Sequence, residues 1–213
     1  MSDTPFTFDD FLTRAKSKLA LAPVFGAEED DIGDHSLDPS LIALRQQGPR
    51  KFAAVLFGIV KGQEPSVLLT QRTSHLPSHA GQIAFPGGKI DADDASPLEA
   101  ALREAQEEVG LARHFVDCLG YLGPYQTTTG FRIMPVVALI DPRRALMANP
   151  DEVADLFEVP LAFLMNPQNH QRHRREFRGR ERIYYAMPFG ERYIWGATAG
   201  MIRSLYSLLY EEA

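Results

Sequence analysis

The sequence predicts an α/β fold, and two observations lead to this prediction. Residues 51–60 form an almost continuous apolar run, which is typical of a buried strand. Farther along, residues 81–111 read as a short strand, a glycine loop and a helix with one apolar face. A helix of this kind can pack on a sheet, so strands and helices are expected to share one core.

Residues 96–110 carry the signals of a helix with defined ends. Ser96 and Glu99 form an S-x-x-E capping box, and Pro97 takes the first helical position. Gly110 is expected to end the helix. The apolar face is formed by residues at helical spacing: Leu98, Ala101, Leu102, Ala105 and Val109.

The other face of this helix carries three carboxylates. Glu104, Glu107 and Glu108 stand at i, i+3 and i+4, so they lie within about a turn of one another. Like charges at this spacing repel by roughly 0.2–0.5 kcal/mol per pair, a penalty that a divalent cation would reverse. Oxygen ligands with no histidine or cysteine nearby select Mg²⁺ or Mn²⁺ rather than zinc. Arg103 can reach Glu99 or Glu107 and hold a ligand carboxylate in one rotamer.

Paired glycines precede the helix in the segment Phe85-Pro86-Gly87-Gly88. Glycine allows the backbone to adopt positive φ and to approach a ligand closely, so the carbonyl of Gly87 or Gly88 can complete a metal shell, with Gly88 as the candidate ligand. A solvated acidic face is the commoner role of neighbouring glutamates. The position of the glycines in front of the helix favours the metal site over that alternative.

The stretch resembles the Nudix box, G-x5-E-x7-R-E-U-x-E-E-x-G-U, in which U is a bulky aliphatic residue. Residues 103–111 match its second half, with the smaller Ala105 at the first U. The first half departs, because the expected glutamate falls on Asp94 and one extra residue separates it from Arg103. The sequence therefore does not assign Asp94 the structural role of that glutamate. The resemblance implies a Nudix α/β/α sandwich, with a mixed sheet between helices.

Flanking segments resemble one branch of this superfamily, the coenzyme A pyrophosphatases. They are LLTQR at 68–72, HAG at 79–81, FPGG at 85–88, YQTTTGF at 125–131, PVV at 135–137 and IWGAT at 194–198. Pro77 stands where the branch usually carries an arginine. A substrate contact is then missing or supplied elsewhere, for instance by His75 or His79.

The resemblance implies metal-dependent hydrolysis of a nucleoside diphosphate derivative. For coenzyme A, or its thioester or disulfide derivatives, the products would be 3′,5′-ADP and 4′-phosphopantetheine. Glu104, Glu107 and Glu108 would hold Mg²⁺ or Mn²⁺. Glu152, in an E-V pair beyond the box, is a candidate auxiliary ligand or base, with a capping or surface carboxylate as the alternative. Glu104, Glu108 and Glu152 all remain open as the general base, and Arg103 completes the catalytic candidates.

Four residues are candidate substrate contacts. Arg72 ends a predicted strand, where it can bind a phosphate or form a surface ion pair. His79 belongs to the motif that precedes the box. Tyr125 and Phe131 can stack on an adenine, although core packing is the commoner use of such aromatics. Trp195, the only tryptophan, is expected to anchor the core rather than to serve as a platform for substrate.

Two rival functions share parts of this pattern. A Nudix hydrolase of ADP-ribose, NADH or another nucleoside diphosphate derivative would have the same box, and only the flanking motifs argue against it. A non-catalytic nucleotide-binding sensor on a Nudix scaffold would typically have lost box glutamates, whereas this helix retains all three. Metal-dependent turnover separates these classes.

Composition and charge exclude several classes. The 213 residues are 45% hydrophobic and 23% charged, which is ordinary for a soluble globular protein, and no apolar run is long enough to span a membrane. Cys118 is the single cysteine and the N-terminus is acidic, so we expect a cytoplasmic protein without disulfides. The net charge of −6 argues against general nucleic-acid binding. The basic run at 170–182 is therefore interpreted as solvated or as a phosphate clamp before weak affinity for RNA.

We expect two regions: an N-terminal helix and connector at 1–50, and a Nudix domain at 51–213. The first helix is predicted at 6–22, and the connector, with a short helix at 41–44, is expected to brace the sheet or a second subunit in a homodimer. Strands are expected at 51–60, 66–72, 82–85, 115–121, 131–140, 153–159 and 183–187. Helices are expected at 97–110, at 160–165 and from Ile194 onward.

Overall fold

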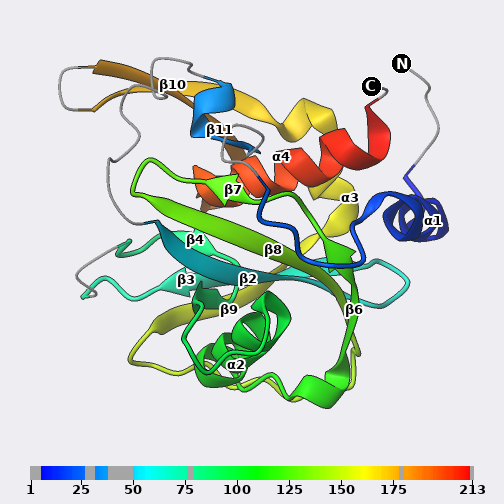
Figure 1. The fold of residues 1–213 in the computed structure, drawn as a ribbon. Helices are drawn as coiled ribbons and strands as arrows, with labels where there is room; N and C mark the ends of the chain where they lie inside the picture. The colour runs from blue at the N-terminus through cyan, green and yellow to red at the C-terminus, as the bar shows by residue number, and fades with distance from the viewer. Residues whose placement is uncertain (1–5, 27–31, 38–49, 76–78, 178–179, 212–213) are drawn as a thin grey trace.

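The structure, a computed structural model, describes residues 6–26, 32–37, 50–75, 79–177 and 180–211. The short helix expected at 41–44 and the position of Pro77 lie outside these residues. The described residues form a nine-stranded mixed sheet, a three-stranded antiparallel sheet and the helices that cover them (Figure 1).

Two long parallel strands, β2 (Lys51–Val60) and β8 (Phe131–Ile140), form the centre of the main sheet and pair along their full length. β3 (Ser66–Arg72) meets the end of β2 in the antiparallel direction and then pairs with β9 (Val153–Pro160). β6 (Val116–Tyr121) pairs antiparallel with β8. All five strands agree with the sequence prediction to within one residue, because β2 and β8 are apolar runs and the other three carry apolar residues between turn signals.

Short strands extend the sheet around the glycine loop. β4 (Ile83–Ala84) pairs with β3, and β5 (Gly87–Lys89) pairs with β2. β7 (Tyr125–Gln126) lies between β8 and β1 (Ile32–Gly33), so the N-terminal region supplies an edge strand. β5 brings the paired glycines alongside the centre of the sheet.

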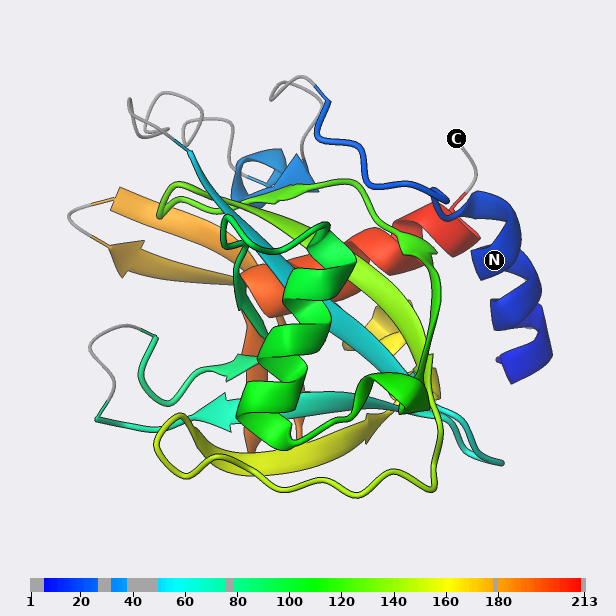
Figure 2. The ribbon, with the colours of Figure 1, turned by 60° about the horizontal axis from the view of Figure 1, so that its bottom comes forward.

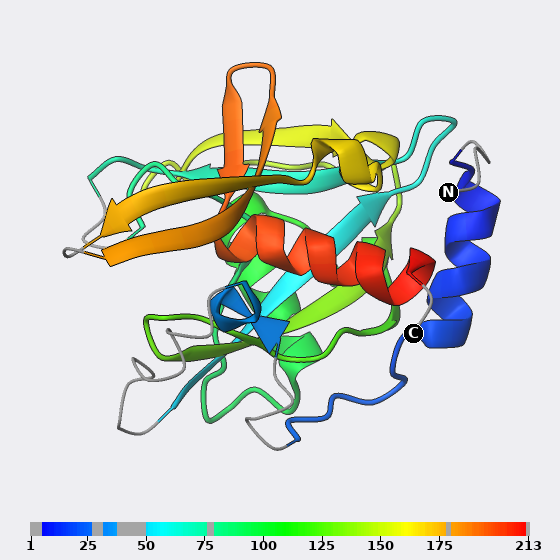
Figure 3. The same ribbon diagram turned by 90° about the horizontal axis from the view of Figure 1, so that it is seen from above.

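Helices cover both faces of the main sheet, so its central strands are apolar on both sides. Leu56 of β2 packs in the core under α2 (Pro97–Val109), whereas its neighbour Phe57 packs in the core under α4 (Ala197–Tyr210). Figure 2 shows α2 lying across one face, and Figure 3 shows α1 (Phe8–Lys18) beside α4 on the other. None of the helices in the described ranges is long and apolar enough to cross a membrane.

The last third of the chain adds the second sheet. α3 (Leu161–Leu164) follows β9 as predicted, and three antiparallel strands come after it. They are β10 (Gln171–Phe177), β11 (Arg180–Phe189) and β12 (Arg192–Trp195). Single 3₁₀ turns lie at η2 (Asp34–Ser36), η4 (Arg113–Phe115) and η5 (Pro167–Asn169). The described part of the basic run lies mainly in β10 and the start of β11, which pair antiparallel, so alternate residues along each strand face opposite sides of the sheet.

The helix expected from Ile194 onward begins later than predicted. Ile194 and Trp195 belong to β12, where Ile194 pairs with Met187 of β11. Gly196, at φ 63°, follows the strand, and the helix starts at Ala197. The sequence signal failed because an apolar pair before a glycine suits a strand end as well as a helix start. Trp195 is only partly buried, so its expected role as a core anchor is also wrong.

The predicted ends of α2 are confirmed. The hydroxyl of Ser96 accepts a hydrogen bond from the N–H of Glu99 at 3.3 Å, and Pro97 occupies the first turn. Gly110 closes the helix at φ 67°, in the left-handed region that favours glycine. Both ends are therefore set by local side-chain and backbone chemistry.

The Ser96→Ala variant should lower the free energy of unfolding by about 1 kcal/mol, because the N–H of Glu99 loses its acceptor. Urea unfolding measures this change. Ser96→Thr keeps the hydroxyl and should lose less. An alanine variant as stable as the wild type would show that the cap does not stabilise this helix.

Candidate active site

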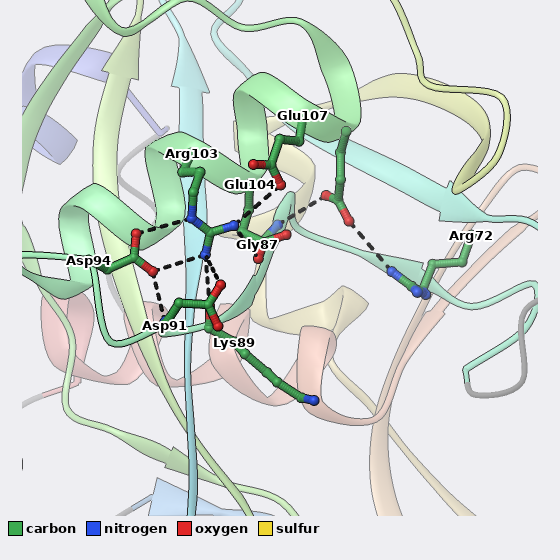
Figure 4. A network of polar contacts seen from close by, with 9 residues as sticks. Arg72, Gly87, Lys89, Asp91, Asp94, Arg103, Glu104 and Glu107 are labelled. Atoms are coloured by element: carbon green, nitrogen blue, oxygen red, sulfur yellow. Dashed lines mark hydrogen bonds and ion pairs between the residues drawn. The ribbon is translucent and has the colours of Figure 1, made fainter.

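The candidate site lies where α2 approaches the glycine strand β5. The side chain of Glu104 points from α2 toward β5 (Figure 4). At Gly88 there is no room for a side chain, because a Cβ would overlap the Glu104 carboxylate. At Gly87, with φ 154°, a Cβ would overlap the backbone of Val55 in β2. Glycine at 88 therefore allows the carboxylate-bearing helix to lie this close to β5, and glycine at 87 allows β5 to lie close to β2.

Glu108 is a buried carboxylate, and the residue is 3% exposed. One of its oxygens accepts a hydrogen bond from the N–H of Gly87 at 3.1 Å, and the other lies 3.5 Å from the guanidinium of Arg72. Burial outweighs both contacts and raises the pKa of Glu108 to about 7, with the charges of Glu104 and Glu152 acting in the same direction. A bound cation would oppose this effect by favouring the charged form.

Arg103 links the loop in front of α2 to the carboxylates on the helix. Its guanidinium donates hydrogen bonds to both carboxylate oxygens of Asp94, at 2.9 and 3.1 Å, and to the carbonyl of Lys89 at 3.1 Å. It also donates to Glu104 at 2.9 Å and to Glu107 at 3.3 Å (Figure 4). The hydrogen bonds from Arg103 to Asp94 hold the pKa of Asp94 below its usual range.

Asp94 has a role that the sequence did not assign to it. The longer loop brings its carboxylate to Arg103, and this bidentate ion pair occupies the guanidinium fork. The expected contact of Arg103 with Glu107 forms. The alternative contact with Glu99 does not, because Glu99 pairs with Arg113 instead.

The three helix carboxylates do not converge in this structure. The side chain of Glu107 is 55% exposed and is held by Arg103. Within the described ranges, no three histidine, cysteine, aspartate or glutamate side chains gather closely enough to hold a metal ion. Glu104 and Glu108 do share one buried region, where burial raises the pKa of Glu104 as well. Their oxygen-only chemistry and poorly compensated charge fit a hard divalent cation. Glu107 would become a further ligand of this cation if its side chain moved away from Arg103.

Glu152 lies at the rim of the same region. It is partly buried just before β9, and its charge raises the pKa of both Glu104 and Glu108. Its carbonyl accepts a hydrogen bond from the N–H of Thr73 at 3.0 Å. This contact places Glu152 beside the end of β3, where Arg72 is located.

Arg72 is the candidate substrate contact that the structure brings to the carboxylates. Its side chain is 24% exposed, and one guanidinium nitrogen faces Glu108. Its Nε is buried and has no hydrogen-bond acceptor among the described residues. His79 lies in the loop between β3 and β4, where its Nδ1 is 2.8 Å from the side-chain oxygen of Gln82.

The two candidate stacking residues lie apart from the carboxylates. Tyr125 is 4% exposed and packs against Gly200 of α4, on the side of the sheet opposite α2. Its surroundings are those of a core residue, so the structure does not bring it to the site. Phe131 is partly buried at the start of β8, with the ammonium of Lys51 5.4 Å from its ring centre.

A family model described as the NUDIX domain matches residues 49–178. The chain belongs to the Nudix hydrolase family. The predicted Nudix fold, with a mixed sheet between helices, is thereby confirmed.

Two relatives of this Nudix protein are named as uncharacterized Nudix hydrolases, NudL. The one from Citrobacter koseri is 37% identical over 205 residues, and the alignment covers 96% of this chain and 96% of the relative. The one from Escherichia coli K12 is 43% identical over 153 residues, which are 72% of this chain and 80% of the relative. A solved Nudix hydrolase from M. smegmatis, RenU, is 24% identical with a TM-score of 0.44, covering 53% of this chain and 71% of that one.

In the absence of divalent cations, this Nudix protein should lose stability as the pH rises from about 4.5 to about 7. Glu108 binds its proton more tightly in the folded state, so the stability from that proton is complete below the unfolded pKa and is lost as the pH passes through the folded pKa. The loss should be roughly 3 kcal/mol, at about 1.4 kcal/mol per pKa unit.

Chemical denaturation at a series of pH values measures this dependence. Glu108→Gln removes the titrating group and should flatten this part of the curve. Glu99→Gln changes a partly exposed carboxylate on the same helix, which pairs with Arg113, and should leave the slope unchanged. If stability changed with pH equally steeply in the wild type and in Glu108→Gln, Glu108 would not be the group that causes the loss.

Proposed function

We propose that this protein hydrolyses the diphosphate of coenzyme A, or of its thioester or disulfide derivatives, with Mg²⁺ or Mn²⁺. The observation that carries the proposal is the pair formed by the partly buried Glu104 and the buried Glu108 facing the glycine strand, with Arg72 at its edge. Family membership supports the hydrolase chemistry. The flanking motifs that resemble coenzyme A pyrophosphatases support the substrate, a small molecule, as the partner of this site.

Each residue at the site has a distinct role in this proposal. Glu104 and Glu108 would hold the cation, and Glu107 and the carbonyl of Gly88 are further donors. When bound, the cation neutralises the diphosphate and lowers the pKa of a coordinated water. Arg72 binds a phosphate oxygen through its Nε. Arg103, itself fixed by the loop, holds Glu104 in one orientation.

Hydrolysis adds water across one phosphoanhydride bond. The water oxygen attacks phosphorus in line with the leaving oxygen, and a carboxylate accepts the proton that the water loses. The bridging P–O bond breaks, which releases 3′,5′-ADP and 4′-phosphopantetheine from coenzyme A. Glu152, at the rim, is a candidate for the base, and Glu104 and Glu108 are the alternatives.

We also propose that residues 1–50 brace the Nudix domain at 51–213. α1 packs against α4, and β1 extends the main sheet at its edge. Phe11 of α1 is fully buried in the core shared with α4. A homodimer and a cytoplasmic location stay predictions, and light scattering of the purified protein measures the first.

The Glu107→Gln variant should abolish turnover of coenzyme A and leave the fold intact. The side chain is 55% exposed, so its loss removes a cation ligand without disturbing the core. Chromatography of the released 3′,5′-ADP measures turnover, and thermal unfolding reports the fold. Glu99 lies on the same helix but pairs with Arg113, away from the candidate site. The Glu99→Gln variant should therefore stay active. An active, well-folded Glu107→Gln variant would refute the ligand assignment.

The substrate can be identified with coenzyme A, ADP-ribose and NADH assayed in parallel, with Mg²⁺, Mn²⁺ or chelator. We expect the highest kcat/KM for coenzyme A and no turnover with chelator. A preference for ADP-ribose or NADH would keep the hydrolase chemistry but refute the coenzyme A assignment. An absence of turnover with every substrate would favour a non-catalytic nucleotide-binding sensor.

A further inference from the structure

The second sheet carries aromatic and basic side chains on one face. In antiparallel strands, residues opposite each other share a face and successive residues alternate between faces. One face therefore holds these residues from β10, β11 and β12: His173, Arg175, Arg182, Tyr184, Tyr193 and Trp195. We call this set the aromatic–arginine face. Glu176 and Glu181 lie on the other face, where Glu181 pairs with Arg174.

The sheet bends so that the aromatic rings gather together. His173 and Tyr193 lie on strands separated by β11, which would stand about 10 Å apart in a flat sheet. The Tyr193 hydroxyl is nevertheless 2.6 Å from Nδ1 of His173, and it is 3.2 Å from the Tyr184 hydroxyl. The rings of Tyr184 and Trp195 are 5.4 Å apart. Figure 3 shows the cause: the β11–β12 hairpin turns away from the direction of the β10–β11 hairpin.

These aromatic side chains do not fill the core. Tyr193 is 38% exposed, and Tyr184 and Trp195 are only partly buried. The opposite face of the same strands supplies the core residues, including the fully buried Met187 and Ile194. Aromatic rings that stay partly exposed while they hydrogen-bond one another form a preorganised surface for a flat ligand.

The aromatic–arginine face adjoins the strand that leads into the carboxylate site. β12 packs against β4, and the hydroxyl of Thr198, just after β12, donates a hydrogen bond to the carbonyl of Ile83 at 2.9 Å. From Ile83 the chain reaches Gly87, the hydrogen-bond donor to Glu108, over at most about 13 Å. A nucleotide carries its base and its diphosphate on opposite sides of the ribose, so one molecule can reach both places.

We propose that the aromatic–arginine face binds the adenine base and the ribose 3′-phosphate of the substrate whose diphosphate is cleaved at the carboxylates, an inference that rests on the proposed function. Tyr184, Tyr193 and Trp195 supply the surface on which the base stacks. Arg175 and Arg182 are opposite each other in the register and flank the phosphate. Arg182 also donates to the Thr128 hydroxyl at 3.4 Å, which ties this face to the turn between β7 and β8.

A free nucleotide suits this face better than an RNA strand does. The net charge of the chain is −6, which opposes the approach of a long polyanion. On the opposite face of the hairpin, Glu176 and Glu181 lie beside Arg174, so the basic residues do not continue around the hairpin as one basic surface. One base and one phosphate are what the two arginines and the aromatic group can accommodate.

Trp195 makes a direct binding test available, because as the only tryptophan it reports from this face alone. Titration with adenosine 3′,5′-bisphosphate should quench its fluorescence in a saturable way. Arg175→Gln should weaken this binding about tenfold, through the loss of a charge-assisted hydrogen bond. Arg174→Gln alters the adjacent arginine on the opposite face and should bind as the wild type does. No quenching, or an equal loss in both variants, would overturn the proposal.

Steady-state kinetics with coenzyme A supply the second readout. Trp195→Leu and Arg175→Gln should each raise KM roughly tenfold and change kcat little, because they remove binding away from the reacting phosphorus. Arg175 is exposed, so its variant tests the proposal even where Trp195→Leu does not fold.

The outcomes separate this inference from the proposed function. If both variants turn over coenzyme A with an unchanged KM, the aromatic–arginine face does not bind the substrate, but the proposed function is still supported. Saturable quenching by the bisphosphate that Arg175→Gln weakens, without turnover of any substrate, supports the face while the proposed function fails. Tighter quenching by a single-stranded RNA oligonucleotide than by the bisphosphate overturns the assignment to a free nucleotide.

Discussion

The close approach of α2 to the glycine strand β5 is the constraint on which the candidate site depends. Without a side chain at Gly88, the carboxylate of Glu104 can lie directly against the strand. Gly87 fits against β2 and turns its N–H toward Glu108. The partly buried Glu104 and the buried Glu108 are thus held by a helix and a sheet, whose positions are fixed by the cores on either side. A site built in this way keeps Glu104 and Glu108 in place when a charged ligand arrives, whereas the exposed Glu107 has to leave Arg103 to join them.

Burial makes this arrangement electrostatically unfavourable in the absence of a cation. The pKa of Glu108 rises to about 7 although Arg72 and a backbone N–H face it, so desolvation outweighs both contacts. Arg103 and Asp94 act differently, because their bidentate ion pair fixes the loop while Arg103 also reaches Glu104. Poorly compensated negative charge at the centre and a fixed frame around it are typical of a functional site.

Local signals predicted much of this structure, and long-range contacts account for what they missed. The ends of α2 follow from Ser96 and Gly110, whose effects act within a turn of the chain. The role of Asp94 depended on how a longer loop folds back, which spacing does not determine. The helix carboxylates and the contact of Arg103 with Glu107 were predicted from their spacing. The bidentate pair of Arg103 with Asp94 was not, and the sequence left open whether Tyr125 packs in the core or contacts substrate. The aromatic–arginine face was missed because it requires the register of three strands and the bend between them.

Calorimetric titration with Mn²⁺ on either side of neutral pH tests the central claim, that Glu104 and Glu108 form a cation site, most directly. We predict one site whose affinity falls as the pH drops below about 7, because Glu108 must lose its proton when the cation binds. Glu104→Gln and Glu108→Gln should both lose most of this affinity. Binding that is independent of pH, or that survives in both variants, would contradict the account.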